Sequence, residues 1–381
     1  MKLAKPRTGQ RLLVKQKQVP FSYWPAIKGP VGPASLQPLL FALDPWAIIE
    51  RVVNKRCPAV SKPEALACLE QAKDFFINTT SAGVVASRPL TMYYSFMNLV
   101  KALCLTRGPR TTFDKAEHGI SEQLRAPNVE LTNAFLKAFP SPSPTSTKLQ
   151  NFAELMSTLT GAGLTTPYEY DLPVLLPQIV PGHRLWAQAA GQPERFIAIH
   201  DIQFWHQPTA SQIWFRLYFV EEDLKRLGVT QKRLLEETGL DSICKKVLCK
   251  EKADGKQLIC LEQKTPLTYA GFPSDALNTL ASQVRWFTWA TVSIVKPYRR
   301  YYAYLCPTAE RPSTLPQLLS IYAISYYLGS ITRYRPHHFD KIVDSEYGPR
   351  IQDFITGQPL QFLYLIASEF AEQDVSKPAI L

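Results

Sequence analysis

The segment ITRYRPHHFDKI gathers the side chains of this sequence that are best suited to chemistry on an anion. Guanidinium groups bind phosphate or carboxylate through paired hydrogen bonds and keep their charge at every physiological pH. Imidazole exchanges protons near neutral pH. The segment therefore suits two kinds of chemistry. Arg335 and His337 can bind an anionic ligand, whereas Arg333 and His338 can act as charge stabiliser and acid–base group on a phosphodiester.

The same segment also has a purely structural interpretation. Pro336 cannot continue a helix, and it biases the preceding residue towards an extended conformation. The apolar helix that precedes the segment is therefore predicted to end at about Arg335. Cations are favoured at the C-terminal end of a helix by its dipole, which explains Arg333 and Arg335 without any ligand. Both interpretations stay open at the level of the sequence.

Two strongly apolar segments each carry a polar stripe at helical spacing. In TMYYSFMNLVKALCL, polar side chains recur at i, i+4 and i+7, and in LLSIYAISYYLGSITRY a stripe of tyrosine, glycine and arginine ends at Arg333. Buried polar groups need partners, so these stripes either line a ligand site between two helices or hydrogen-bond to each other. The other ligand-binding residues expected here are Tyr94, Asn98 and Lys101 from the first helix, His118 from the loop after it, and Tyr326 from the second helix.

The elements that must position these side chains indicate an α+β fold. Helical periodicity dominates both ends of the chain, and each end contains a helix that is apolar almost all round. Such helices need neighbours on several sides, so we expect the N- and C-terminal helices to pack together as one helical body. Between them, two pairs of β-branched and aromatic runs predict hairpins, one of them turning at Asp254-Gly255. A short helix capped by Thr230 and ended by Gly239 separates the hairpins.

The predicted domain organisation follows these changes in composition. The expected parts are a basic, proline-rich N-terminal arm (1–34), an N-terminal helical part (35–138), a linker with a short helix (139–164), an α+β insert (165–272), and a C-terminal strand with helices that pack on the N-terminal part (273–381). The arm is expected to touch nucleic acid or, as a partly ordered lead-in, to pack along the body through FSYWPAI. No internal repeat is evident.

The segment VKPYRRYYAYL resembles a nucleic-acid-binding strand in its composition. Aromatic rings interleaved with Arg299 and Arg300 suit base stacking and phosphate contact. The alternative is a half-buried strand whose aromatic side chains pair across a sheet. Ligand binding by Arg299 and Arg300 is therefore an expectation that depends on their exposure.

Bulk composition limits the classes of protein. The chain has 381 residues and a formal net charge of +11, which favours anionic partners. It shows neither a signal-peptide core nor a run of about 18 apolar residues, so no membrane partner is expected. Seven cysteines, an odd number, favour buried thiols and a cytoplasmic location. Cys244, Cys249 and Cys260 lack metal-ligand spacing, so neither a metal nor another cofactor is expected.

Three segments resemble the YaaC-like family of bacterial proteins: YYSFMNLVKALCL, YYLGSITRYRPHHFDKI and DSEYGPRIQDFITGQPLQFLYLIASEF. Their order and spacing extend the resemblance over most of the chain. That family has no established activity, so the resemblance implies none. The matching residues are Tyr94, Asn98, Lys101, Arg333, Tyr334 and Pro336.

The Arg-x4-His spacing of Arg333 and His338 also resembles the motif of HEPN-type ribonucleases, and the tyrosine-rich helix is similar to one in HEPN-like bundles. In that family arginine and histidine converge on a scissile phosphate. The resemblance implies a metal-independent ribonuclease, a toxin or antiviral defence effector, that acts as a dimer. Pro336 departs from the simple motif because it reshapes the turn between the two residues.

Three functions are therefore expected from the sequence. The first is binding of an anionic ligand, which is a nucleotide, RNA or DNA, at a site between the two buried helices. The second is a HEPN-like ribonuclease that uses Arg333 and His338. The third is a structural or interaction subunit without chemistry, which forms a homodimer or binds a partner protein. This third function would be favoured if Arg333 proved to be buried against a carboxylate.

Overall fold

The structure is a computed structural model that describes residues 3–25, 27–28, 35–36, 39–81, 86–125, 131–142 and 148–379. Contacts divide the chain into two compact units. Unit 1 comprises Met1–Phe41, Pro193–Arg311 and Glu372–Leu381, and unit 2 comprises Ala42–Gln192 and Pro312–Ala371. Residues 1–2, 26 and 29–34 of the predicted arm and residues 143–147 of the predicted linker lie outside the described residues.

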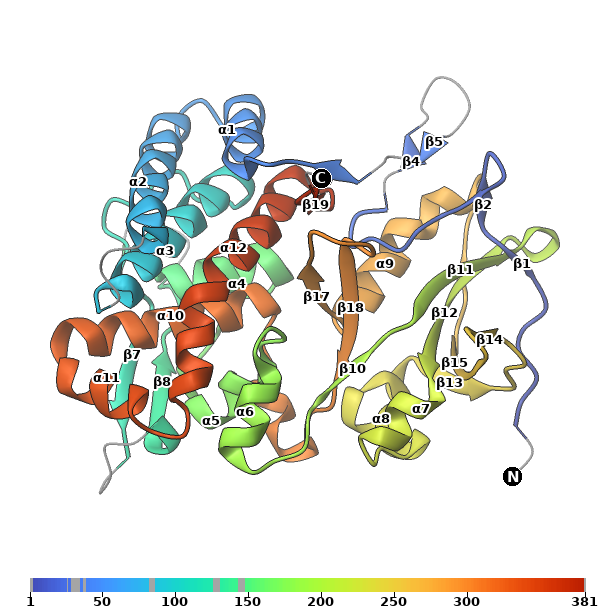
Figure 1. The fold of residues 1–381 in the computed structure, drawn as a ribbon. Helices are drawn as coiled ribbons and strands as arrows, with labels where there is room; N and C mark the ends of the chain where they lie inside the picture. Colours follow the sequence, from blue (N-terminus) through green and yellow to red (C-terminus); the bar gives the residue numbers. More distant parts are fainter. Residues whose placement is uncertain are drawn as a thin grey trace. The chain divides into compact units, whose positions relative to one another are not determined.

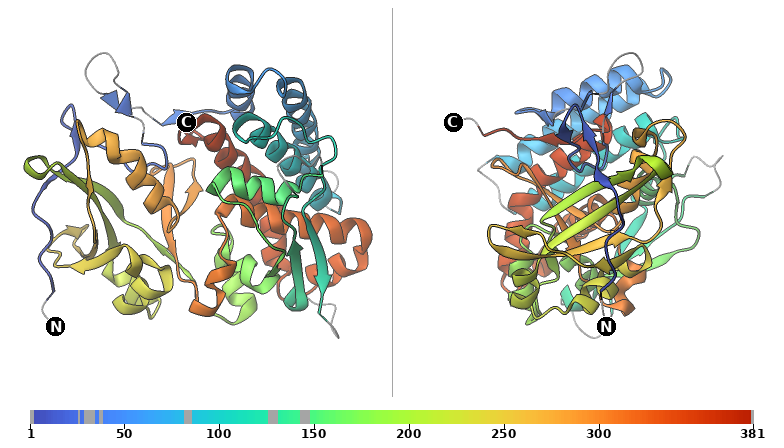
Figure 2. Two further views of the ribbon diagram at one scale, coloured as in Figure 1. Left: turned by 180° about the vertical axis from the view of Figure 1, so that it is seen from behind. Right: turned by 90° about the vertical axis from the view of Figure 1, so that its right-hand side faces the viewer.

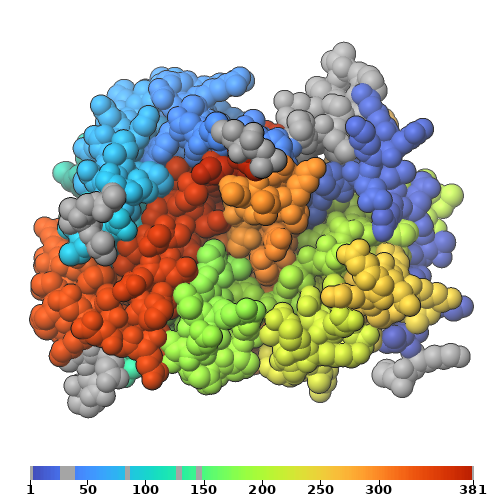
Figure 3. Space-filling view, in the orientation of Figure 1, coloured from blue at the N-terminus to red at the C-terminus, as the bar shows by residue number. Residues whose placement is uncertain are grey.

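Unit 2 is mainly helical (Figure 1). Its helices are α1 (Pro45–Arg56), α2 (Lys62–Thr80), α3 (Arg88–Arg107), α4 (Asn151–Thr160), α5 (Leu172–Leu175), α6 (His183–Ala190), α10 (Gln317–Tyr334), α11 (Pro336–Val343) and α12 (Gly348–Ala371). In Figure 3 the orange-to-red residues of the C-terminal helices adjoin the blue residues of α1 and α2. The expected packing of N- and C-terminal helices is therefore confirmed.

Helix α3 lies at the centre of unit 2 because its apolar side chains cover most of its circumference. Phe96 stacks on Phe362 of α12, with ring centroids 3.9 Å apart. On another side α10 approaches closely at Gly329, where an added Cβ would lie 3.0 Å from Tyr93 Cβ and 3.1 Å from the Pro89 carbonyl oxygen. Glycine at this position therefore sets how near α10 can come to α3.

The predicted end of the long C-terminal helix is confirmed. Helix α10 ends at Tyr334, and Arg335 leaves helical geometry with φ −144°. Pro336 then occupies the first position of α11, where its missing N–H would be unpaired in any case. Pro336 thus ends α10, as predicted, and also begins α11, a helix that the sequence did not predict.

A small antiparallel sheet completes unit 2. Strand β7 (Ile120–Leu124) pairs with β8 (Ala134–Ala138), and β8 pairs with β9 (Tyr168–Asp171). Strand β7 carries Glu122, and His118 lies just before the strand; both side chains contact Tyr326 of α10.

Unit 1 is built on antiparallel strands. Its larger sheet has the strand order β1-β11-β12-β15-β13, in which the long strands β11 and β12 run side by side (Figure 2). The strands of this sheet are β1 (Gln10–Arg11), β11 (Asp201–Gln207), β12 (Gln212–Val220), β13 (Cys244–Val247), β14 (Lys252–Ala253), β15 (Lys256–Gln263) and β16 (Leu267–Thr268). Helices α7 (Glu221–Arg226), α8 (Gln231–Thr238) and α9 (Leu277–Arg285) accompany it.

A second sheet of unit 1 has the order β10-β18-β17, and the described residues of this unit also form separate two-stranded pairs. Their bounds are β10 (Phe196–Ala198), β17 (Trp289–Val292), β18 (Arg299–Tyr304), β2 (Leu13–Val14), β3 (Lys17–Gln18), β4 (Ile27–Lys28), β5 (Ser35–Leu36), β6 (Leu40–Phe41) and β19 (Val375–Ser376). The last strand, β19, pairs in parallel with β6.

Both predicted hairpins are confirmed, one as β11–β12 and the other with its turn at Asp254-Gly255 between β14 and β15. The helix between them, α8, begins with the Thr230 hydroxyl accepting from Arg233 N and ends at Gly239 in the left-handed conformation. Local turn and cap residues therefore determine these features.

The described N-terminal residues belong to unit 1. Strand β1 pairs with β11, and Leu12 and Val19 are buried in the core of this unit. Phe21 packs against this core, as expected for a lead-in that runs along the body. The basic residues nearby thus lie on a segment held by main-chain pairing.

The α+β fold class is confirmed at the level of mixed helix and antiparallel sheet. The compact units divide at other residues than the predicted domains. Helices α5 and α6, which fall within the predicted insert, belong to unit 2. Strands β17 and β18, which fall within the predicted C-terminal part, belong to unit 1, where β18 pairs with β10. Within the described residues, no helix combines the length and apolar character that crossing a membrane requires.

Candidate functional site

Unit 2 contains a small pocket of about 150 Å³ between the N-terminal half of α3, the C-terminal half of α10 and strand β7, here named the Arg333 pocket. Close approach of α10 to α3 at Gly329 brings the two polar stripes together at one end. The lining residues are Leu90, Tyr93, Tyr94, His118, Glu122, Tyr326, Gly329, Ser330, Arg333 and Tyr334.

The cation of this pocket, Arg333, is exposed in the last turn of α10. Its Nη1 donates to the Tyr94 hydroxyl at 2.8 Å, and its guanidinium carbon lies 4.9 Å from the centre of the Tyr334 ring. No carboxylate of the described residues lies within ion-pair distance of Arg333. The side chain is thus oriented by neutral aromatic groups and keeps an uncompensated positive charge.

The acidic group of the pocket, Glu122, is already paired. Its carboxylate accepts from Arg335 Nη2 at 3.0 Å and from the Tyr326 hydroxyl at 3.3 Å. The side chains of Glu122 and Arg335 are 15% and 27% exposed, so their charges largely cancel within the wall of the pocket. An anion that enters therefore meets the field of Arg333 with little opposition from Glu122.

A hydrogen-bonded row of side chains leads from the core to the pocket. The hydroxyls of Tyr322 and Tyr93 lie 3.4 Å apart, and the Tyr93 hydroxyl lies 2.6 Å from His118 Nδ1. Burial raises the pKa of both tyrosines, so both keep their protons. Burial, together with the charges of Lys101 and Arg333, lowers the pKa of His118, so its imidazole is neutral at pH 7.

This arrangement lets a neutral His118 act as a hydrogen-bond donor. If Tyr93 donates to Nδ1, the imidazole proton sits on Nε2. Nε2 has no hydrogen-bond partner among the described residues. The pocket can then offer an anion two N–H donors, one from the Arg333 guanidinium and one from His118.

Other predicted residues of the stripe on α3 have different surroundings. Asn98 is buried, and its amide nitrogen lies 3.4 Å from Gln71 Oε1 of α2, so it takes part in a contact between helices. Lys101 is half-buried and reaches the pocket through its electrostatic effect on His118. Tyr94 is the member of this stripe that meets Arg333.

The two histidines of the opening segment lie in the first turn of α11. The rings of His337 and His338 contact each other with centroids 4.3 Å apart. Neither ring lines the Arg333 pocket. Arg333 and His338 belong to separate helices, because Pro336 breaks the chain direction between them. The histidine that shares a pocket with Arg333 is therefore His118.

Arg299 and Arg300 belong to β18 of unit 1 and differ in their exposure. Arg299 is buried and forms an ion pair with Asp374, with Nη1 and Oδ1 3.3 Å apart, so its binding of a ligand stays a prediction. Arg300 is exposed. Tyr304 is buried against Phe196. The segment is accordingly a half-buried strand, the alternative that the sequence left open.

The sequence did not single out two important members of the pocket, Tyr93 and Glu122. Tyr93 stands within an apolar run, and Glu122 follows His118 by four residues on β7. The described residues contain no group of three or more histidine, cysteine, aspartate or glutamate side chains placed to hold a metal ion. Five of the seven cysteines are buried.

Comparison with known proteins identifies the family. A search of curated proteins and a search of solved structures each found no significant match. The family model described as YaaC-like Protein matches residues 41–370, which include every residue of the Arg333 pocket. This chain therefore belongs to the YaaC-like family.

Proposed function

We propose that this chain binds the phosphate group of a nucleotide or of a nucleic acid strand in the Arg333 pocket. The observation that carries the proposal is the exposed, uncompensated guanidinium of Arg333, held by Tyr94 beside a neutral His118. A charged donor fixed in this way binds oxyanions more strongly than a neutral one. The net charge of +11 favours the approach of such ligands.

Pocket size limits how the ligand is held. A cavity of about 150 Å³ is smaller than the roughly 300–1,000 Å³ that typical small-molecule sites provide. It can enclose one anionic group, while the sugar and base of a nucleotide stay outside it. The pocket would therefore bind the phosphate and would not discriminate between bases.

The proposal is tested by titration calorimetry with ribose 5-phosphate, and with uncharged ribose as the matched ligand. Ribose 5-phosphate is expected to bind, and ribose is not. Arg333→Gln is expected to weaken binding at least about tenfold, because a hydrogen bond from a charged donor contributes about 1.5–3 kcal/mol. Arg51→Gln is the control, since Arg51 is an exposed arginine of α1 in the same unit and outside the pocket.

A single-stranded RNA oligomer extends the test to a polymer. Its affinity is expected to fall steeply between low and high salt, because phosphate contacts release bound counterions. Binding that is unchanged in Arg333→Gln, or that persists equally in high salt, would contradict the proposal.

A ribonuclease remains the second proposal, now with a different pair of residues. Arg333 and His118 line one pocket, and arginine with histidine can stabilise charge and transfer protons at a phosphodiester. Incubating the oligomer with the protein and with His118→Gln and His338→Ala variants distinguishes the cases. Cleavage lost only in His118→Gln supports this version, cleavage lost only in His338→Ala supports the HEPN-like pair, and intact RNA throughout excludes both.

A further inference from the structure

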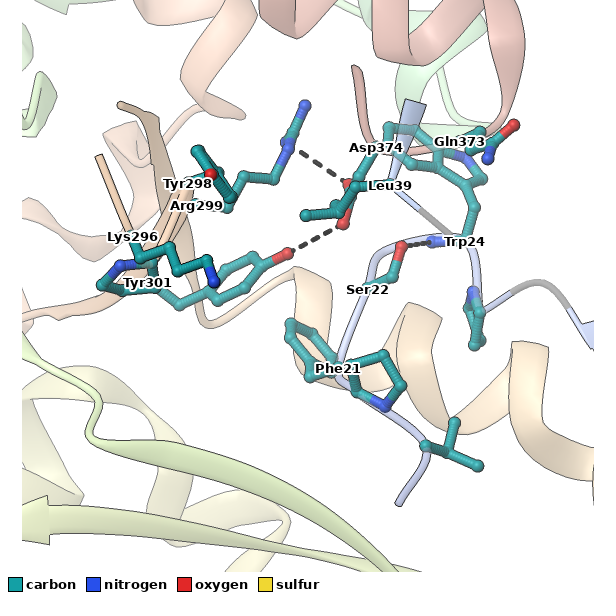
Figure 4. Close-up of a pocket in the computed structure, with 14 residues that line it drawn as sticks. Phe21, Ser22, Trp24, Leu39, Lys296, Tyr298, Arg299, Tyr301, Gln373 and Asp374 are labelled. Atoms are coloured by element: carbon teal, nitrogen blue, oxygen red, sulfur yellow. Dashed lines mark hydrogen bonds and ion pairs between the residues drawn. The ribbon is translucent and has the colours of Figure 1, made fainter. Parts of the chain in front are cut away.

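Unit 1 contains a second and larger cavity, of about 520 Å³, here named the Trp24 pocket. Three stretches of the chain line it: the N-terminal segment, the loop that leads into β18 with the first residues of that strand, and the residues just before β19. Figure 4 shows their side chains around one space, with Asp374 between Arg299 and Tyr301. The volume lies within the range of sites that enclose a whole small molecule.

Aromatic rings form much of the lining, and each of them packs against a neighbouring side chain. Phe21 meets Tyr301 edge-to-face at 4.8 Å between centroids, and Tyr298 meets Phe41 in the same way at 4.8 Å. The Trp24 ring lies 4.9 Å from the guanidinium carbon of Arg285. Rings fixed by such contacts lose little freedom when a flat ligand packs on them. The lining therefore favours an aromatic ligand over a flexible aliphatic one.

The buried charges in the floor of the pocket balance each other. Arg299 and Asp374 form an ion pair, Arg299 Nη2 donates to the Val375 carbonyl at 2.8 Å, and the Tyr301 hydroxyl donates to Asp374 Oδ2 at 3.1 Å. This pairing leaves Lys296, which is exposed, as the lining cation that no carboxylate of the described residues pairs with. A ligand with one negative group would meet this ammonium.

We propose that the Trp24 pocket binds a planar aromatic molecule that carries a single anionic group. The ring packs among Phe21, Trp24 and Tyr298, and the anionic group pairs with Lys296. This site is independent of the Arg333 pocket, since it lies in the other unit and its lining shares no residue with that pocket.

Titration calorimetry with three probes tests the proposal. 2-Naphthoate has a flat ring system and a carboxylate, 2-naphthalenemethanol has the ring system alone, and cyclohexanecarboxylate has the carboxylate on a ring that is not flat. We expect 2-naphthoate to bind at least about fivefold more tightly than either of the others, because the ring and the charge each contribute. Equal affinity for 2-naphthoate and its alcohol would overturn the assignment of Lys296, and equal affinity for the two carboxylates would overturn that of the rings.

Matched variants locate the binding. Lys296→Met is expected to weaken 2-naphthoate about fivefold and leave the alcohol unchanged, whereas Tyr298→Leu weakens both about three- to tenfold. Lys250→Met and Trp286→Leu are the controls, because both side chains are exposed in unit 1 and lie outside the pocket. Arg333→Gln should bind 2-naphthoate normally. Loss of binding in Arg333→Gln with retention in Lys296→Met would refute the Trp24 pocket and point to the Arg333 pocket instead.

Discussion

Two glycines within helices of unit 2 allow a sharp test of how α10 packs on α3. At Gly329 an added Cβ would lie 3.0 Å from Tyr93 Cβ and 3.1 Å from the Pro89 carbonyl oxygen, closer than ordinary van der Waals contact. At Gly357 of α12 nothing lies within 4 Å of the same atom. Alanine at either site adds the same methyl group to a helix, so the pair separates packing from helix propensity.

The expected magnitudes follow from these distances. Replacing glycine by alanine inside a helix stabilises it by about 1 kcal/mol, which is the whole effect expected for Gly357→Ala. Overpacking costs about 1–3 kcal/mol. Gly329→Ala should therefore be about 0–2 kcal/mol less stable than the natural protein, and about 1–3 kcal/mol less stable than Gly357→Ala.

Urea unfolding followed by far-ultraviolet circular dichroism gives the free energies of unfolding, provided that all variants have the same slope with urea. Gly329→Ala should also weaken ribose 5-phosphate binding, because Tyr93 holds His118 and would be displaced. Gly357→Ala should leave that affinity unchanged. If Gly329→Ala stabilises the protein as much as Gly357→Ala does, the close approach of α10 to α3 is refuted.

Three further predictions concern charges. The pKa of His118 is lowered in the folded state, so neutral His118 stabilises the fold fully above the unfolded pKa of about 6.5, and this stabilisation declines as the pH falls below that value. Urea unfolding at a series of pH values should show a smaller decline in the free energy of unfolding for His118→Gln. An identical decline would contradict this cause. Glu122→Gln leaves Arg335 without its carboxylate partner and so adds a net positive charge beside the Arg333 pocket. Calorimetry should then show ribose 5-phosphate binding up to about fivefold more tightly. Weaker binding would contradict the charge argument. Arg299→Met leaves the carboxylate of Asp374 buried without its cation, so the free energy of unfolding in urea should fall by about 3–5 kcal/mol. Adding Asp374→Asn should recover part of that loss. If the two substitutions lower the free energy of unfolding additively, the ion pair is not the cause.

Features that depend on neighbouring residues in the sequence were predicted well. Pro336 ends α10, Gly239 ends α8, and Asp254-Gly255 forms a hairpin turn. Each outcome depends on backbone restrictions or caps within a few residues. The fold class followed from the same local signals, since long apolar helices and alternating strands are distinct in their periodicity.

Features that depend on tertiary partners were predicted poorly. In the segment SKPE, the spacing of Ser61 and Glu64 predicts a capping box at the start of α2. Ser61 makes no side-chain cap, however, and Glu64 accepts from Phe113 N at 2.8 Å. A carboxylate can satisfy either backbone group, and only packing decides which one is near.

The candidate site shows the same division. His118 was expected near the stripe on α3, whereas Glu122 was not expected at all. The position of Glu122 depends on the path of β7 past α10, where Tyr326 and Arg335 donate hydrogen bonds to its carboxylate. Sequence spacing carries no information about such a path.

The order of segments in unit 1 has a consequence for its biosynthesis. Strand β6 is translated long before its partner β19 and before Asp374, whose carboxylate neutralises Arg299. At about 5–20 residues per second, the interval between these two strands is on the order of tens of seconds. Throughout that interval the edge of β6 lacks its native partner strand. The helical unit, whose last residue is Ala371, is fully synthesised before unit 1 is. Of the two units, the sheet unit is thus expected to complete its folding second.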